Sequence, residues 1–134
     1  MLVIENLSFG YGSEPVIKNI DLTISEGAHL SVIGESGCGK STLLKLIYGN
    51  VDAGTGSVTF NNTLIQGPKY KLIAGHDDVK FLTQDFGLMP YITVAENVGK
   101  YLSNVNKLEK KRKIIELLEL VGMEDFFDVK GTGL

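Results

Sequence analysis

The residues best suited to chemistry lie in one stretch, Gly34 to Thr42. It fits the phosphate-binding loop pattern G-x-x-x-x-G-K-[ST] at every fixed position. Its glycines allow a tight turn in which successive N–H groups converge on a phosphate. Lys40 would bring a positive charge to the β- and γ-phosphates, and the Ser41 hydroxyl would ligate Mg²⁺. The candidate nucleotide-binding residues here are Gly34, Glu35, Ser36, Gly37, Cys38, Gly39, Lys40, Ser41 and Thr42.

The segments on either side of this loop have the character that a phosphate-binding loop requires. Residues 28–33 are mostly apolar and β-prone, and they predict a strand that begins at His29 and runs directly into the loop. Residues 41–48 predict a short helix that ends at Gly49, and its N-terminal end would favour bound anions. A strand, a glycine loop and a helix in this order indicate a nucleoside triphosphate site rather than a chance glycine-rich turn.

Composition limits the classes of protein to consider. The 134 residues suffice for one domain or part of a larger one, and 43% hydrophobic residues are enough for a core. No apolar run is long enough to span a membrane, and the first residues lack the basic region of a signal peptide. The net charge of −3 argues against a nucleic-acid partner, and the basic turn 110–113 is expected to be a solvated helix face. The single cysteine excludes an internal disulfide and suits a reducing cytosol.

Alternating and turn-forming residues predict a β layer around the loop. Ile20, Leu22 and Ile24 alternate along one strand, and Asn61-Asn62 suits the left-handed turn of a β-hairpin. The fold class expected is therefore α/β, with antiparallel strands beside a nucleotide-binding core. The expected strands cover residues 2–9, 16–24, 57–60, 63–65 and 79–83.

Two further helices are expected after the β layer. Thr93 and Glu96 have the spacing of a capping box, for a helix that runs to about Leu102. A second helix follows, with Glu109 placed to pair with Lys113 four residues later. The apolar face predicted for it comprises Leu108, Ile115, Leu118 and Gly122, with Ile114, Leu117 and Val121 beside it.

These residues together resemble the ATP-binding cassette (ABC) ATPases that power ABC transporters. Ser8 to Tyr11 looks like the family's adenine-stacking loop, and Gly34 to Thr42 looks like its Walker A loop. Gln84 looks like the Q-loop glutamine, and 88–98 is similar to the start of the helical subdomain, which contacts membrane subunits in transporters. The resemblance implies a P-loop NTPase core with an antiparallel β layer over 1–92 and the start of a helical subdomain over 93–134.

The resemblance also implies roles and partners. ATP and Mg²⁺ would be the cofactors, with Tyr11 on the adenine, Lys40 and Gln84 in catalytic roles, and Ser41 and Gln84 on the metal. The partners implied are membrane-embedded transporter subunits and a second copy of the ATPase subunit. The protein would act in the cytoplasm, held at the inner face of the membrane by those subunits.

The sequence departs from the family pattern at its end. The signature motif, the Walker B strand with its catalytic glutamate, and the switch histidine cannot be placed up to Leu134. We therefore expect an incomplete domain that has no ATPase activity alone and has unpaired strand edges, so that it is marginally stable, aggregates or pairs with another chain. The alternatives are a nucleotide-binding or protein-interaction module without hydrolysis, and an ABC ATPase that works outside transport.

Overall fold

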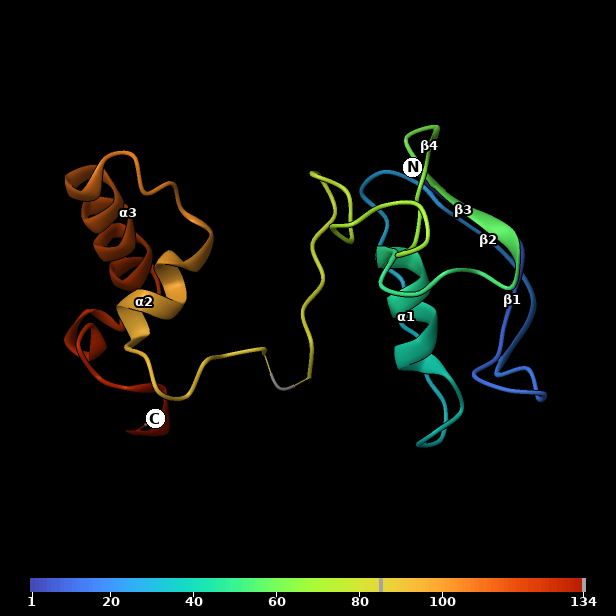
Figure 1. Cartoon of the computed structure of the whole chain (residues 1–134), viewed down its shortest axis with the longest axis horizontal. Helices are drawn as coiled ribbons and strands as arrows, with labels where there is room; N and C mark the ends of the chain where they lie inside the picture. The colour runs from blue at the N-terminus through green and yellow to red at the C-terminus, as the bar shows by residue number, and fades with distance from the viewer. Residues whose placement is uncertain (85, 134) are drawn as a thin grey trace. The chain divides into compact units, whose positions relative to one another are not determined.

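A computed structural model describes residues 1–84 and 86–133 of the chain. Leu134, the last residue of the predicted helical part, lies outside the described residues. The chain forms two compact units, Met1–Phe81 and Leu82–Leu134 (Figure 1). None of the described helices combines the length and apolar character that crossing a bilayer requires.

The first unit contains an antiparallel sheet with strand order β2-β1-β3-β4. The predicted antiparallel layer is confirmed, and so is the hairpin between β3 and β4. Asn61 and Asn62 have φ values of 47° and 64°, which is the left-handed region that a two-residue hairpin turn needs. The strands are β1 (Leu2–Phe9), β2 (Ile17–Ile24), β3 (Thr55–Phe60) and β4 (Thr63–Leu64).

A bulge in β1 decides which side chains reach the core. Ile4 and Leu7 are both buried although they are three residues apart, which strict alternation along a strand would forbid. The register of β1 shifts between these two residues, and Asn6 takes a left-handed φ of 53° there. Gly56 of β3 lies against this point, because a Cβ on it would overlap the Asn6 carbonyl oxygen. The bulge therefore directs two large apolar side chains to the same face.

The helix α1 (Lys40–Tyr48) packs on this face and shares a buried cluster with the sheet (Figure 1). It begins and ends where the sequence predicts, and Gly49 closes it with a left-handed φ of 80°. Leu43 and Leu46 supply the helix side of the cluster, and β1, β2 and β3 supply the remainder. The buried members are Ile4, Leu7, Ile17, Leu43, Leu46 and Val58.

Two predicted strands do not form, and these predictions are wrong. Residues 28–33, including His29, and residues 79–83 have no strand structure, and no described strand pairs with either segment. A strand requires a neighbour to take its backbone hydrogen bonds, and β-prone residues alone do not supply one. The side chain of Ile33 is 92% exposed, so the segment before the loop is unpaired and apolar.

The second unit is helical, with a small core of Val94, Ala95, Ile114 and Leu118. The capping box at Thr93 is confirmed: Glu96 N donates to Thr93 Oγ1 at 3.1 Å, and Thr93 N donates to Glu96 Oε2 at 2.7 Å. The helix ends at Val98 and continues as a 3₁₀ turn, close to the predicted end at Leu102. The elements are α2 (Val94–Val98), α3 (Lys107–Leu120) and 3₁₀ turns at Gly99–Tyr101, Glu124–Phe126 and Gly131–Gly133.

Helix α3 is present, but its buried face differs from the prediction. Ile114 and Leu118, both in the predicted set, are buried, whereas Leu108, in the first turn of the helix, is 82% exposed. The expected pairing of Glu109 with Lys113 is also wrong for the described residues, since Lys113 lies 3.6 Å from Glu116 instead. The Asn106 side chain caps the helix by accepting from two backbone N–H groups.

The unpaired segment gives a first prediction. In the 134-residue chain, the amides of 28–33 should exchange with solvent far faster than those of Leu2–Phe9, because the former have no strand partner. Hydrogen–deuterium exchange with mass spectrometry measures both segments in one sample. Strong protection of 28–33 would contradict this and would indicate a strand partner, such as a second copy.

The capping box gives a prediction about pH. The hydrogen bond from the Thr93 N–H, and then the Thr93 side chain and the charge of Lys130, lower the pKa of Glu96. A carboxylate of lowered pKa stabilises the fold above its unfolded pKa of about 4.3, and that contribution is lost as the pH falls through its folded pKa. Glu96→Gln keeps the geometry and removes the charge, so it should destabilise the chain at pH 7 and have little effect at pH 3. Urea unfolding at both pH values tests this.

The control is Glu119→Gln, an exposed position on α3. It should leave stability nearly unchanged at both pH values. A destabilisation by Glu96→Gln that did not depend on pH would show that shape rather than charge matters at this position. Thr93→Ala, which removes the cap itself, should cost about 1 kcal/mol at neutral pH.

Candidate nucleotide-binding site

The loop that precedes α1 is shaped by two glycines in left-handed conformations. Gly37 has a φ of 83° and Gly39 a φ of 102°. Gly39 is also buried, and a Cβ on it would lie 3.0 Å from Val16 Cγ1 and 3.2 Å from Ile17 Cδ1. The loop therefore needs glycine at 39 both for its backbone angle and for its close contact with the start of β2.

The side chain of Lys40 folds back over the loop. Its Nζ donates to the carbonyl oxygens of Gly34 at 2.8 Å and Glu35 at 2.6 Å, and it lies 3.7 Å from Cys38 Sγ. Lys40 is half-buried, so its ammonium is held within the loop. This arrangement places a fixed positive charge beside the N-terminal end of α1.

The first turn of α1 offers backbone donors that the helix does not use. The first helical hydrogen bond runs from Leu43 N to Gly39 O at 2.9 Å, so the N–H groups of the preceding residues have no carbonyl partner within the helix. Within the part of the chain that the structure describes, no side chain caps this end and no acidic residue lies in its first turn. Free N–H groups, the positive end of the helix dipole and Lys40 together form a donor set that fits phosphate oxygens.

The two hydroxyl residues that follow Lys40 differ in exposure. Ser41 is exposed, which suits a side chain that ligates a metal ion carried by a nucleotide. Thr42 is 8% exposed and therefore belongs to the packed part of the helix. The Ser41 hydroxyl thus faces solvent, whereas Thr42 packs against the interior and helps to hold the start of the helix in place.

Tyr11 lies in a separate loop whose end touches the phosphate loop. Its side chain is 65% exposed, and its ring meets the Phe9 ring edge to face with centroids 4.9 Å apart. A hydrogen bond of 2.8 Å from Val16 N to Phe9 O closes this loop. Val16 also contacts Gly39, so this one residue joins the loop that carries Tyr11 to the phosphate-binding loop.

Gln84 is not one of the residues that form this arrangement. It belongs to the second unit, where it is exposed within a turn, and its predicted roles continue to depend on the sequence alone. The loop and Tyr11 both belong to the first unit.

Sequence reasoning missed two contacts of the loop. The sequence pattern places Val16 only in a strand, and it does not reveal that the Val16 side chain packs against Gly39. Cys38 is exposed, and its Sγ would be 2.8 Å from a Cβ on Gly34, so this cysteine occupies the space that glycine leaves free. Neither contact has a signal in the sequence beyond nearness to the loop.

Comparisons with known protein families and curated relatives agree with these features. The family model described as "ABC transporter" matches residues 17–132. The aliphatic sulfonates import ATP-binding protein SsuB of Albidiferax ferrireducens is 33% identical over 92% of this chain and 41% of its own length. The taurine import ATP-binding protein TauB of Escherichia coli O157:H7 is 38% identical over 92% of this chain and 47% of its own length. The chain thus spans less than half the length of these relatives.

Solved structures support the fold. The dimeric structure of MJ0796, a bacterial ABC transporter cassette, superposes with a TM-score of 0.76 at 28% identity, over 100% of this chain and 63% of that one. A dimeric post-hydrolysis state of the same cassette, bound to ADP and Pi, gives a TM-score of 0.73 at 27% identity. These matches confirm the predicted fold class, a P-loop NTPase core with an antiparallel β layer, present in part.

The contacts of the loop glycines predict an order of mutational effects. Gly37→Ala should cost roughly 1–2 kcal/mol for its left-handed backbone, because the space around it is open. Gly39→Ala carries the same backbone cost and also forces its Cβ against Val16, so it should be the more destabilising change. Urea unfolding of both variants measures the difference.

Gly12→Ala is the matched control, since a Cβ there meets nothing within 4 Å and its backbone is not left-handed. It should leave the free energy of unfolding within about 0.5 kcal/mol of the parent. The proposed packing of Gly39 would be wrong if Gly39→Ala were as mild as this control.

Proposed function

Because this chain belongs to the ABC transporter family, we propose that it is the nucleotide-holding part of an ATP-binding subunit. In that role it binds MgATP and drives transport through partner membrane subunits. The observation that carries the proposal is made at the N-terminal end of α1. There, N–H donors that the helix does not use lie beside the Lys40 ammonium, and the first turn has no acidic residue to neutralise them.

The triphosphate is held by the loop. The N–H groups of Gly37 and of Gly39 to Thr42 donate to its oxygens, whereas the Cys38 N–H donates to Glu35 O within the loop. Lys40 exchanges its bonds to two loop carbonyls for bonds to the β- and γ-phosphates. The exchange is favourable because a carbonyl oxygen carries only a partial negative charge, whereas phosphate oxygens share a full one. A lysine already held at the loop also loses less side-chain entropy when the nucleotide binds.

The contacts proposed with Mg²⁺ and with adenine are made by exposed side chains. Ser41, with its exposed hydroxyl, would hold Mg²⁺, which neutralises phosphate charge when it is bound. The family resemblance assigns Gln84 to the same ion. The exposed ring of Tyr11 stacks on the adenine, and its edge-to-face contact with the Phe9 ring restricts its orientation. Hydrolysis in the whole protein is an in-line attack on the γ-phosphate, for which Lys40 and Gln84 position and stabilise the reacting groups.

The names of the relatives favour an importer. They are import ATP-binding proteins for sulfonates, spermidine and putrescine, iron and taurine, so the proposal names a class of transporter and no cargo. A second copy of the subunit completes the nucleotide sites, as the dimeric state of MJ0796 suggests. Membrane subunits then hold the pair at the inner face of the membrane. These names argue against a non-transport ABC ATPase and against a module without turnover.

The proposal predicts the effect of Lys40→Ala. Loss of two charge-assisted bonds should weaken MgATP binding by at least about 2 kcal/mol, roughly thirtyfold. Isothermal titration calorimetry on the 134-residue chain measures this. Lys45→Ala, an exposed lysine in the last turn of the same helix, is the control and should bind as the parent does. If Lys40→Ala bound MgATP normally, the assignment of the phosphate loop would fail.

A further inference from the structure

The second unit carries a concentrated positive charge that nucleotide binding does not use. Between Gly99 and Lys113 the sequence has six basic residues and one acidic residue, a net charge of +5 in a chain whose total is −3. The basic residues are Lys100, Lys107, Lys110, Lys111, Arg112 and Lys113. We call residues 99–113 the basic surface.

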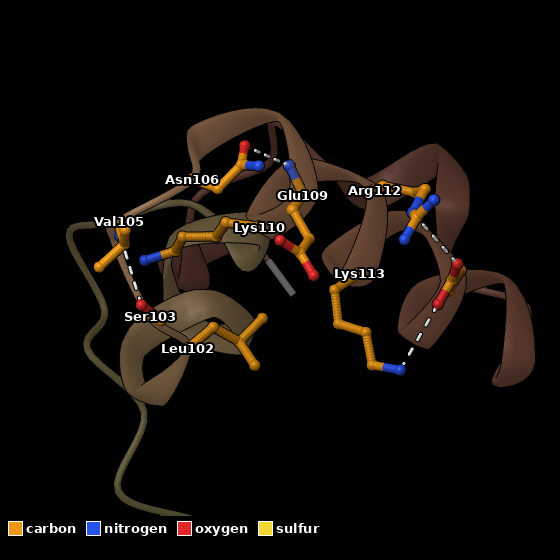
Figure 2. Close-up of a pocket in the computed structure, with 9 residues that line it drawn as sticks. Leu102, Ser103, Val105, Asn106, Glu109, Lys110, Arg112 and Lys113 are labelled. Atoms are coloured by element: carbon orange, nitrogen blue, oxygen red, sulfur yellow. Dashed lines mark hydrogen bonds and ion pairs between the residues drawn. The ribbon is translucent and has the colours of Figure 1, made fainter.

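Large apolar side chains project from the same surface. Tyr101 is 88% exposed, Val105 96% and Leu108 82%. A hollow of about 410 Å³ lies between the Leu102–Asn106 segment and α3. Figure 2 shows the side chains that line it. Val105 and Leu102 line it together with Lys110, Arg112 and Lys113, and a smaller adjoining hollow is lined by Leu108 and Arg112. Leu102 and Val105 therefore lie beside Lys110, Arg112 and Lys113 around the first hollow, which Glu109 and Glu116 also line.

The stability of α3 does not account for these charges. Basic residues in the first two turns of a helix oppose its macrodipole, and here the last turn has no basic residue. Arg112 and Lys113 both pair with Glu116, at 3.7 and 3.6 Å, but all three side chains are more than half exposed, so the pairs contribute little. Lys110 donates to the neutral amide of Asn104 at 2.8 Å. The Lys111 ammonium lies 5.8 Å from the centre of the Phe127 ring. These exposed contacts are weak enough for an anionic partner to replace them.

We propose that the basic surface docks on an anionic lipid bilayer. Val105 and Leu108 enter the interface between headgroups and acyl chains, Tyr101 lies at headgroup level, and the lysines and Arg112 contact lipid phosphates and carboxylates. Tyr101 already has the Lys100 ammonium 5.2 Å from its ring centre, the combination of aromatic and cation that such interfaces favour.

A bilayer suits this surface better than an acidic protein. The three exposed apolar side chains stand on separate turns, so a folded partner would need a matching pocket for each of them. A fluid interface accepts them without such pockets. This contact is direct and differs from attachment through membrane subunits, and it does not depend on nucleotide binding.

Flotation with phosphatidylcholine vesicles, with and without phosphatidylserine, tests the proposal on the 134-residue chain. The chain should float with the phosphatidylserine vesicles only, and added salt should release it. The variant Lys107→Glu, Arg112→Glu, Lys113→Glu should bind at least about a hundredfold more weakly. Glutamate at 107 suits the first turn of the helix, but glutamates at 112 and 113 would repel Glu116 and Glu109. Circular dichroism must therefore show the parent's helix content before the loss of binding is attributed to surface charge.

Matched variants separate the contributions. Lys18→Glu, Lys69→Glu, Lys80→Glu changes the net charge equally on exposed sites of the first unit and should float as the parent does. Val105→Ser with Leu108→Ser should weaken binding without altering its salt dependence. Lys40→Ala should bind vesicles normally, which distinguishes this proposal from the nucleotide site.

Three outcomes would overturn the proposal. They are absence of flotation with phosphatidylserine vesicles, equal flotation of the two charge-reversed variants, and flotation that salt does not affect. Binding to immobilised polyglutamate but not to vesicles would assign the basic surface to an acidic polypeptide instead.

Discussion

The structure of the first unit depends on how α1 is seated on the sheet. Leu43 and Leu46 pack against Ile4 and Leu7, and this contact fixes the direction in which the helix begins. Backbone N–H groups recognise a phosphate only if they converge, and they converge only if the helix axis is held. The bulge at Asn6 is therefore part of the site, because it brings Leu7 to the same face as Ile4.

The same packing links two recognition tasks that lie far apart in the sequence. Gly39 ends the phosphate loop against Val16, and Val16 closes the loop that carries Tyr11. A change in the angle of α1 would move Gly39 and would disturb the contact that joins these loops. The proposed contacts to phosphate and adenine would thus be coupled through one buried glycine and one valine, without a dedicated connecting element.

Features that depend on a few neighbouring residues could be predicted from the sequence. The Thr93 capping box, the Asn61-Asn62 turn and the Gly49 helix end each involve interactions within about one turn of chain. Features that depend on a distant partner could not. Residues 28–33 have β-prone side chains, yet a strand also needs an adjacent strand, and no described strand lies there. Leu108 fits the helical period but falls on the side of α3 that nothing covers.

The two sets of lysines differ in what surrounds them, and this decides what each set can recognise. Lys40 is half-buried, and its ammonium donates to the carbonyl oxygens of Gly34 and Glu35, which fix its position, so it suits one ligand of defined geometry. The lysines of the basic surface are mostly exposed, and the partners that they have are neutral groups or the exposed Glu116, so they would act through their summed charge. Summed charge on an exposed surface is screened by salt and is indifferent to the shape of its partner. A fixed donor set in a loop is less sensitive to salt and depends on the shape of its ligand, because its selectivity comes from geometry. The sequence contains lysine in both places, and only the packing around each one distinguishes the proposed phosphate site from the proposed lipid-binding surface.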